Sequence, residues 1–280
     1  DRSVSRGLGD VYKRQLLSTM RRAIGDYNMI KDGDHIAVGV SGGKDSLTLL
    51  TALKAYQRFS PENFELSAIT VDLGFKGTDQ NEVKALIDYT EKLGVPYYIV
   101  PTDIGEILFD VRKESNPCSL CSKMRRGALN NKAKEIGANK IALGHHADDV
   151  IQTIFLSLFY EGRFSSFAPT AYMDRSGIEL IRPFIYVWEK DLKSVVAKLD
   201  LPVLNNVCPA NKHTQREYIN LLIKDIQKDV PFVKERMLGA IKHPERANLW
   251  PEYQPYVKLS KEERDQKLKN KLERQSENND

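Results

Sequence analysis

The sequence predicts an α/β fold, a doubly wound parallel sheet with helices on both faces and further helices at the C-terminal end. Short apolar stretches alternate with helical patterns between residues 35 and 162, and a glycine-rich turn follows the first apolar stretch. Such alternation is typical of βαβ units, whose parallel strands are covered on both faces. The 280 residues are 41% hydrophobic, which is enough to bury a sizeable core.

The first half of the chain supplies the parallel strands. An amphipathic helix is expected over residues 16 to 30, and the "KDGD" turn ends it. After it, apolar runs and helical periodicity predict four strands and three intervening helices. The strands are expected at 35 to 40, 64 to 73, 95 to 102 and 139 to 146, and the helices at 46 to 59, 80 to 93 and 117 to 136.

A long apolar helix is expected next, over residues 148 to 162. Its apolar side chains share one helical stripe, which is typical of a core-facing surface. They are Val150, Ile151, Ile154, Phe155, Leu158 and Phe159. A hairpin is then expected over 167 to 184 with its turn at 174 to 177, followed by helices at 188 to 200, 214 to 229 and 231 to 242.

Composition and charge narrow the domain organisation and the partners. Residues 1 to 15 lack periodicity and are expected to be a non-native or disordered leader, 16 to 250 one domain, and 251 to 280 a charged, solvated or frayed tail. With 42 Lys and Arg against 38 Asp and Glu, RNA binding requires a local basic patch. The absence of a long apolar run predicts no membrane partner and a cytoplasmic location.

The turn "SGGKDS" has the composition of a phosphate-binding loop between a strand and a helix. It comprises Ser41, Gly42, Gly43, Lys44, Asp45 and Ser46. Its glycines let backbone N–H groups approach an anion at a helix N-terminus. Lys44 adds a cation, and Asp45 is a candidate ligand for Mg²⁺. The loop differs from a Walker A motif, which requires glycine where Val38 stands. A plain glycine-rich turn is the structural alternative.

Three cysteines, an odd number, argue against a secreted disulfide framework and favour metal binding or thiol chemistry. Cys118 and Cys121 open a helix, with Asn116 as the expected N-cap and Pro117 in the first turn. Helical geometry predicts that both thiols face inward, and the helix dipole is expected to stabilise their thiolates. Cys208 is the third thiol.

The spacing of the cysteines leaves the metal open. Three thiolates on a four-iron cluster leave one iron free to react, so Cys118, Cys121 and Cys208 are consistent with iron–sulfur chemistry. With His213 they are equally consistent with a closed structural zinc site. A redox dithiol and ordinary buried thiols are the weaker alternatives.

Basic residues on the outer side of the cysteine helix are candidate phosphate contacts for RNA. They are Lys123, Arg125, Arg126, Lys132 and Lys134. A solvated helix face explains them as well. The aromatic residues between 159 and 167 could stack on bases or belong to the core.

Taken together, these motifs resemble one family. "SGGKDS" is similar to the PP-loop of ATP pyrophosphatases. With the Cys-x-x-Cys pair, "GHHADDVIQTIFLSLFYEG", "IRPF" and a lone downstream cysteine, the chain resembles the tRNA 2-thiocytidine synthetases. The resemblance implies adenylation of O2 of the cytidine at tRNA position 32 and its replacement by sulfur, with ATP, Mg²⁺ and a [4Fe–4S] cluster held by Cys118, Cys121 and Cys208. It also implies a sulfur donor such as a cysteine desulfurase, and a possible homodimer.

The resemblance assigns roles to further residues and leaves alternatives. Lys44, Asp45 and the three cysteines are then catalytic, and Val71, Asp72 and Gly144 border the nucleotide. Asp148 or Asp149 joins Asp45 on Mg²⁺, although Asp148 also suits a helix N-cap. His145 and His146 suit a general base, a phosphate contact or a structural role.

Other functions remain open at this stage. One is a PP-loop enzyme of thiouridine or lysidine type with structural zinc, in which Cys121 or Cys208 carries a persulfide. Another is an ATP-binding sensor without turnover.

Overall fold

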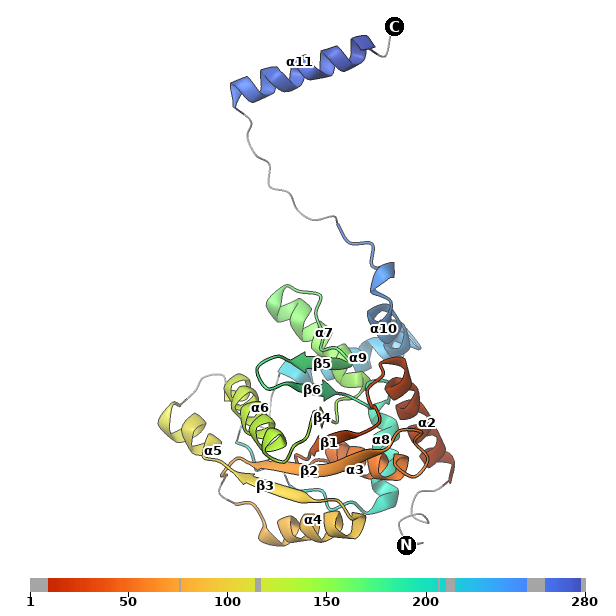
Figure 1. Ribbon diagram of the computed structural model, residues 1–280, viewed down its shortest axis with the longest axis vertical. Helices are drawn as coiled ribbons and strands as arrows, with labels where there is room; N and C mark the ends of the chain where they lie inside the picture. The colour runs from red at the N-terminus through yellow and green to blue at the C-terminus, as the bar shows by residue number, and fades with distance from the viewer. Residues whose placement is uncertain are drawn as a thin grey trace. The chain divides into compact units, whose positions relative to one another are not determined.

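The computed structural model describes residues 10–75, 77–113, 117–205, 207–209, 215–250 and 260–277 (Figure 1). The chain divides into two compact units, residues 1–239 and 240–280. The sequence had placed this division at residue 250. Among the described residues, no helix combines the length and apolar character needed to cross a bilayer.

A six-stranded sheet forms the centre of the first unit, in the order β3-β2-β1-β4-β6-β5. The strands are β1 Asp34–Gly39, β2 Phe64–Asp72, β3 Tyr97–Pro101, β4 Lys140–Ala142, β5 Thr170–Met173 and β6 Ile178–Ile181. Neighbouring strands are parallel except for the edge pair β5 and β6. This pair is the expected hairpin, and it extends the parallel sheet beyond the four predicted strands.

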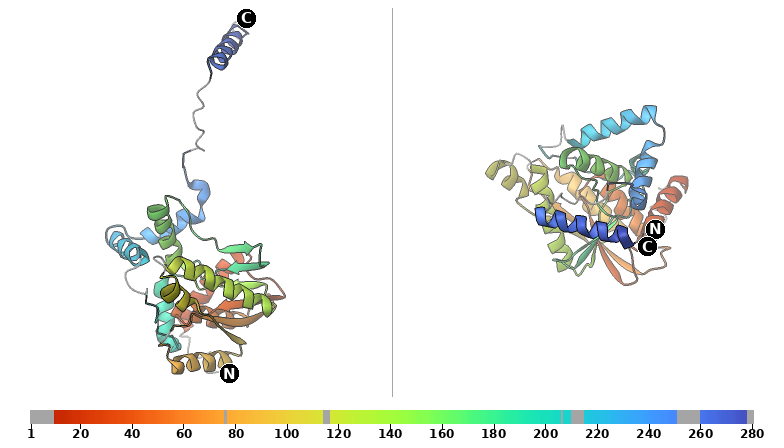
Figure 2. Two further views of the ribbon diagram at one scale, coloured as in Figure 1. Left: turned by 90° about the vertical axis from the view of Figure 1, so that its left-hand side faces the viewer. Right: turned by 90° about the horizontal axis from the view of Figure 1, so that it is seen from above.

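Helices cover both faces of the sheet, which confirms the predicted fold class (Figures 1 and 2). From β1 the chain runs through β2 to β3 at one edge of the sheet and then returns past β1 to β4. Because such crossover connections are right-handed, α3 and α4 lie on one face of the sheet and α6 lies on the other. In the first unit the helical segments are α2 Asp10–Asp26, α3 Lys44–Tyr56, α4 Gln80–Leu93, α5 Ile104–Glu106, the π-helix η1 Ile107–Val111, α6 Pro117–Glu135, α7 Ala147–Glu161, α8 Glu189–Leu199 and α9 Gln215–Asp229. Helix α10, Val233–Lys242, crosses into the second unit, which also holds η2 Pro244–Arg246 and α11 Lys261–Glu277.

The topology fixes where a ligand can bind. Strands β1 and β4 are adjacent and parallel, yet the connections that leave them run in opposite directions along the sheet. In open α/β sheets the ligand crevice lies at the carboxyl ends of such a pair. The "SGGKDS" loop follows β1 and the "GHHADD" segment follows β4, so both lie at this crevice.

The structure differs from the sequence prediction at three helices. Helix α2 begins at Asp10 and so includes residues that the sequence assigned to the leader; residues 1–9 lie outside the described part. Helix α11 gives the charged tail a helical segment, whose residues 261–270 are exposed. On α7, Val150 and Ile151 are buried as predicted, but Phe159 is 50% exposed.

The end of α7 is a surface. Tyr160 is 51% exposed and Phe164 is 67% exposed, so the core interpretation of these aromatic residues is wrong. The prediction failed because helical periodicity reports an apolar stripe but not how far along the helix its covering partner extends. Phe167, by contrast, is half-buried.

Candidate functional site

The loop after β1 is closed by its own hydroxyl groups. The Ser41 N–H donates to Ser46 Oγ over 3.1 Å, and the Ser46 hydroxyl donates to the Gly43 carbonyl over 2.9 Å. Gly42 has a φ of +78°, which favours glycine, and Gly43 is the N-cap of α3. The loop is therefore pre-shaped at a helix N-terminus, where backbone N–H groups bind anions.

A distant segment lies directly on this loop. The Leu204 N–H donates to the Gly42 carbonyl over 2.9 Å, and a Cβ at Gly42 would overlap the Leu204 side chain. On the other side, Asn205 donates to the Glu82 carboxylate through its N–H, over 2.9 Å, and through its amide. The segment that leads to Cys208 is thus hydrogen-bonded to the loop after β1.

Lys44 is held by two carboxylates. Its Nζ lies 3.0 Å from Asp45 Oδ2 and 3.2 Å from Glu189 Oε1. Burial acts to lower the pKa of Lys44, but the two ion pairs outweigh it and raise the pKa, so the side chain is a cation. Glu189 was missed in the sequence, because no local pattern shows that the start of α8 reaches a loop far away in the chain.

Asp45 retains coordinating capacity. Its Oδ1 is buried and has no hydrogen-bond partner among the described residues, while Oδ2 pairs with Lys44. A carboxylate oxygen without a donor suits a hard cation such as Mg²⁺. The backbone of Asp45 also packs against Gly144, where a Cβ would lie 3.1 Å from the Asp45 carbonyl oxygen.

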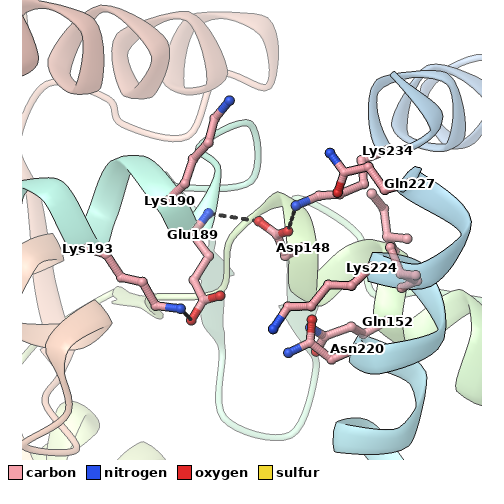
Figure 3. Close-up of a pocket in the computed structure, with 11 residues that line it drawn as sticks. Asp148, Gln152, Glu189, Lys190, Lys193, Asn220, Lys224, Gln227 and Lys234 are labelled. Atoms are coloured by element: carbon pink, nitrogen blue, oxygen red, sulfur yellow. Dashed lines mark hydrogen bonds and ion pairs between the residues drawn. The ribbon is translucent and has the colours of Figure 1, made fainter. Parts of the chain in front are cut away.

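Asp148 belongs to a neighbouring pocket of about 190 Å³ between α7, α8, α9 and α10 (Figure 3). Its Oδ2 accepts the Glu189 N–H over 2.8 Å, and its Oδ1 pairs with Lys234. The N-cap of α7 is His146, so the N-cap interpretation of Asp148 is wrong: Asp148 instead satisfies the start of α8. Both of its oxygens are engaged, so it fits a metal less well than Asp45.

His145 and His146 lie in the loop after β4, and Asp149 lies in the first turn of the following helix α7. Asp149 Oδ2 accepts the His146 N–H over 3.0 Å, and Asp149 Oδ1 lies 3.6 Å from Arg216. Burial lowers the pKa of His145 to about 4; Asp149 opposes this shift, and Arg182 and Arg216 reinforce it. His145 is therefore neutral at physiological pH, so any contact that it makes with a phosphate is a hydrogen bond and not an ion pair.

The depressed pKa of His145 makes stability depend on pH. The unfolded chain binds a proton near pH 6.5 and the folded chain only near pH 4, so stability is full above pH 6.5 and is lost as the pH falls toward 4. Between pH 7.5 and 4, the free energy of unfolding of His145→Gln should therefore fall by on the order of 3 kcal/mol less than that of the wild type. Denaturant unfolding at several pH values between 7.5 and 4 measures it, and parallel curves for the two proteins would contradict the assignment.

The three cysteines converge across the chain. The charges of Cys118 and Cys208 both act on Cys121, although Cys208 is far away in sequence. Pro117 opens α6 as predicted, while the expected N-cap Asn116 and the zinc candidate His213 lie outside the described residues. All three cysteines are thiols rather than disulfides.

Two expectations about these thiols are corrected. Cys118 is exposed, so only Cys121 and Cys208 are partly covered. Burial raises the pKa of Cys121, with Arg125 opposing and the other two thiols adding to the rise, so the helix dipole does not make it a low-pKa thiol. Ligand thiols lose their protons when a metal binds.

The donor set fits an iron–sulfur cluster in its chemistry. Thiolates are the usual cluster ligands, and three of them leave one iron open. Among the described residues, no three His, Cys, Asp or Glu side chains already stand in a metal-binding arrangement. Cys118, Cys121 and Cys208 are neighbours that a metal would have to draw together.

The basic residues of α6 divide into two groups. Lys123, Arg125, Arg126 and Lys134 are exposed. Lys132 differs, since it pairs with Glu135 over 2.6 Å and lies 5.1 Å from the Tyr98 ring centroid. A groove of about 620 Å³ runs between α6 and the β5–β6 hairpin, and its walls include Arg126, Lys134 and, from the hairpin, Arg175.

Val71 and Asp72 end β2, next to the loop after β1. Asp72 Oδ1 accepts the Gly74 N–H over 3.0 Å, and the Asp72 carbonyl accepts the Thr102 hydroxyl over 2.6 Å. The Asp72 side chain therefore shapes the turn, which leaves the half-buried Val71 as the apolar element at this edge.

Fold and loop together define a PP-loop protein, and the PP-loop domain family matches residues 12–224. The chain is 36% identical over 236 residues to the tRNA-cytidine(32) 2-sulfurtransferase of Pelobacter propionicus, covering 82% of this chain and 87% of the relative. It is 41% identical over 219 residues to that of Ralstonia pickettii, covering 78% and 69%. The chain therefore belongs to the tRNA-cytidine(32) 2-sulfurtransferase family.

A solved structure shares the fold. The U34-tRNA thiolase NcsA from Methanococcus maripaludis, solved with its [4Fe-4S] cluster, matches with a TM-score of 0.70 at 26% identity. The match covers 85% of this chain and 80% of that protein. This relative is an iron–sulfur enzyme that acts on tRNA.

Proposed function

We propose that the protein uses ATP to adenylate O2 of the cytidine at position 32 of tRNA and replaces that oxygen with sulfur, giving 2-thiocytidine. The convergence of Cys208 with Cys118 and Cys121 beside an intact PP-loop is the observation that carries the proposal. A plain nucleotide-binding protein has no need of three thiols at this edge of the sheet. The names of the relatives and the cluster of the U34 thiolase support the acceptor and the cofactor.

In the first step the cytosine O2 attacks the α-phosphorus of ATP, and pyrophosphate leaves. The loop amides and Lys44 neutralise the charge that develops on the phosphates. Asp45 is the proposed Mg²⁺ ligand, since its buried Oδ1 has no donor among the described residues. Neutral His145 can accept or donate a hydrogen bond in the same crevice.

In the second step a sulfide attacks C2, and AMP leaves with the former O2. The carbonyl becomes a thiocarbonyl, and the sulfur, already at the sulfide level, requires no oxidant. When bound, a cluster held by Cys118, Cys121 and Cys208 supplies one open iron position for sulfide. The hydrogen bond from the Leu204 N–H to the Gly42 carbonyl fixes a point four residues before Cys208 on the loop that is proposed to hold ATP.

The substrate nucleotide is expected to enter unstacked, because paired bases hide their edges from a protein. The exposed basic side chains of α6 and the groove between α6 and the hairpin suit the phosphates of an anticodon stem-loop. A sulfur donor such as a cysteine desulfurase and a homodimeric state remain parts of the proposal that the family suggests.

Nucleoside analysis tests the proposal. Anaerobically reconstituted protein is incubated with ATP, Mg²⁺, sulfide and unmodified tRNA, and the digested nucleosides are weighed by mass spectrometry. We expect 2-thiocytidine that depends on ATP, together with tRNA-dependent pyrophosphate. Thiouridine or lysidine in its place would reassign the acceptor, and the absence of tRNA-dependent pyrophosphate would favour a sensor.

A further inference from the structure

Arg182 is a buried cation that the chemistry above does not use. It follows β6 directly and is only 7% exposed. Its Nη1 donates to the Ala168 carbonyl over 2.6 Å, and its guanidinium lies 4.9 Å from the Phe167 ring centroid. Its Nε is buried and has no hydrogen-bond partner among the described residues.

The neighbours of Arg182 include the cation Arg126 and the neutral His145, and the Asp149 carboxylate acts on the same His145 ring. Burial and the charge of Arg126 together lower the pKa of Arg182 to about 10. The His145 ring lies 4.9 Å from the same Phe167 ring, and His145 Nδ1 is also buried without a partner among the described residues. No Asp or Glu in the described part of the chain forms an ion pair with Arg182 within 4.0 Å. A buried, unpaired cation is costly, and an anion that binds there relieves the cost.

The position of Arg182 separates it from the ATP phosphates. The PP-loop follows β1, and Arg182 follows β6, with β4 between them. Two strand spacings amount to about 10 Å. Arg126 comes from the cysteine helix α6 and also lines the groove between that helix and the hairpin. Arg126, whose charge acts on the buried Arg182, therefore also forms part of the wall of this groove.

We infer that Arg182, Arg126 and His145 form a binding site for one phosphodiester group of the RNA backbone, next to the nucleotide that enters the active site. Arg182 supplies its unused Nε–H, Arg126 a second charge, and neutral His145 a hydrogen bond. Phe167 holds the guanidinium in place. The inference rests on the proposed RNA substrate and adds a specific anchor to it.

Salt-dependent tRNA binding tests the inference. We expect Arg182→Gln to weaken binding about 10-fold and to lower the slope of log K against log salt by about 1 between about 50 and 200 mM. Arg58→Gln is the matched control: it removes the same charge just past the far end of α3, away from the loops of the site, and should keep the wild-type slope. ATP affinity should be unchanged in both variants.

Thermal unfolding shows whether Arg182→Gln is folded. A second variant keeps the inference testable if it is not. Arg126 is exposed, so Arg126→Gln should fold normally and lower the slope similarly. A double-mutant cycle combines this variant with anticodon stem-loops that carry one methylphosphonate, an uncharged linkage, near the target nucleotide. One such linkage should weaken wild-type binding but weaken binding to Arg126→Gln much less.

The outcomes separate the inference from the proposed function. If Arg182→Gln and Arg126→Gln both keep the salt dependence of tRNA binding shown by Arg58→Gln, the phosphate site is overturned while the proposed thiolation stands. A loss of ATP affinity together with an unchanged salt dependence of tRNA binding would show that these residues bind a phosphate of ATP, which would also overturn the inference. Wild-type protein that shows neither tRNA binding nor tRNA-dependent pyrophosphate would remove the proposed function itself.

Discussion

Replacing Lys44 with alanine is expected to reduce tRNA-dependent pyrophosphate release by at least about 10²- to 10³-fold. The Nζ of Lys44 lies between the Asp45 and Glu189 carboxylates, so its removal deletes the cation proposed to bind phosphate and leaves two negative groups facing the proposed site of the triphosphate. Both effects oppose ATP binding and the charge that develops on the leaving pyrophosphate. Pyrophosphate release at saturating tRNA measures the loss.

Lys54→Ala provides the control, because Lys54 is on the same helix but in its last turn, away from the loop. It should retain full activity. Wild-type turnover by Lys44→Ala would contradict the proposed phosphate-binding role of this lysine.

Cys208→Ala is expected to end thiolation while leaving ATP binding unchanged. Cys208 interacts electrostatically with Cys121, and its loss leaves two thiol ligands where a cluster with one open iron needs three. The PP-loop keeps its contact with Leu204, four residues earlier, so the nucleotide site should survive. Mass spectrometry of the nucleosides and ATP titration read the two functions separately.

The comparison of Cys208→Ala with Lys44→Ala separates the two halves of the reaction. The cysteine variant should still release pyrophosphate with tRNA, whereas the lysine variant should show the large loss of pyrophosphate release given above. Normal thiolation by Cys208→Ala would contradict the three-cysteine cluster.

The architecture was accessible from the sequence because it depends on local patterns. The parallel strands and α4 follow from apolar periodicity, and the α4 prediction coincides with Gln80–Leu93. The loop residues were found because glycine, lysine and serine at fixed spacing after a strand have one dominant use.

The parts that the sequence did not predict depend on contacts between distant segments. Glu189 meets Lys44, and Leu204 meets Gly42, only because the sheet order brings their elements together. The exposure of Cys118 and the burial of Arg182 also depend on contacts between distant segments. Sequence periodicity indicates which face of an element is apolar but not which other elements cover it.

The proposed reaction depends most on Cys118, Cys121 and Cys208 holding an iron–sulfur cluster beside the PP-loop. The most direct test is the absorption spectrum and metal content of protein purified without oxygen. We expect a broad thiolate-to-iron charge-transfer band and about four irons per chain, both lost in Cys208→Ala. One tightly bound zinc and a colourless protein would contradict it and place the thiols in a structural site.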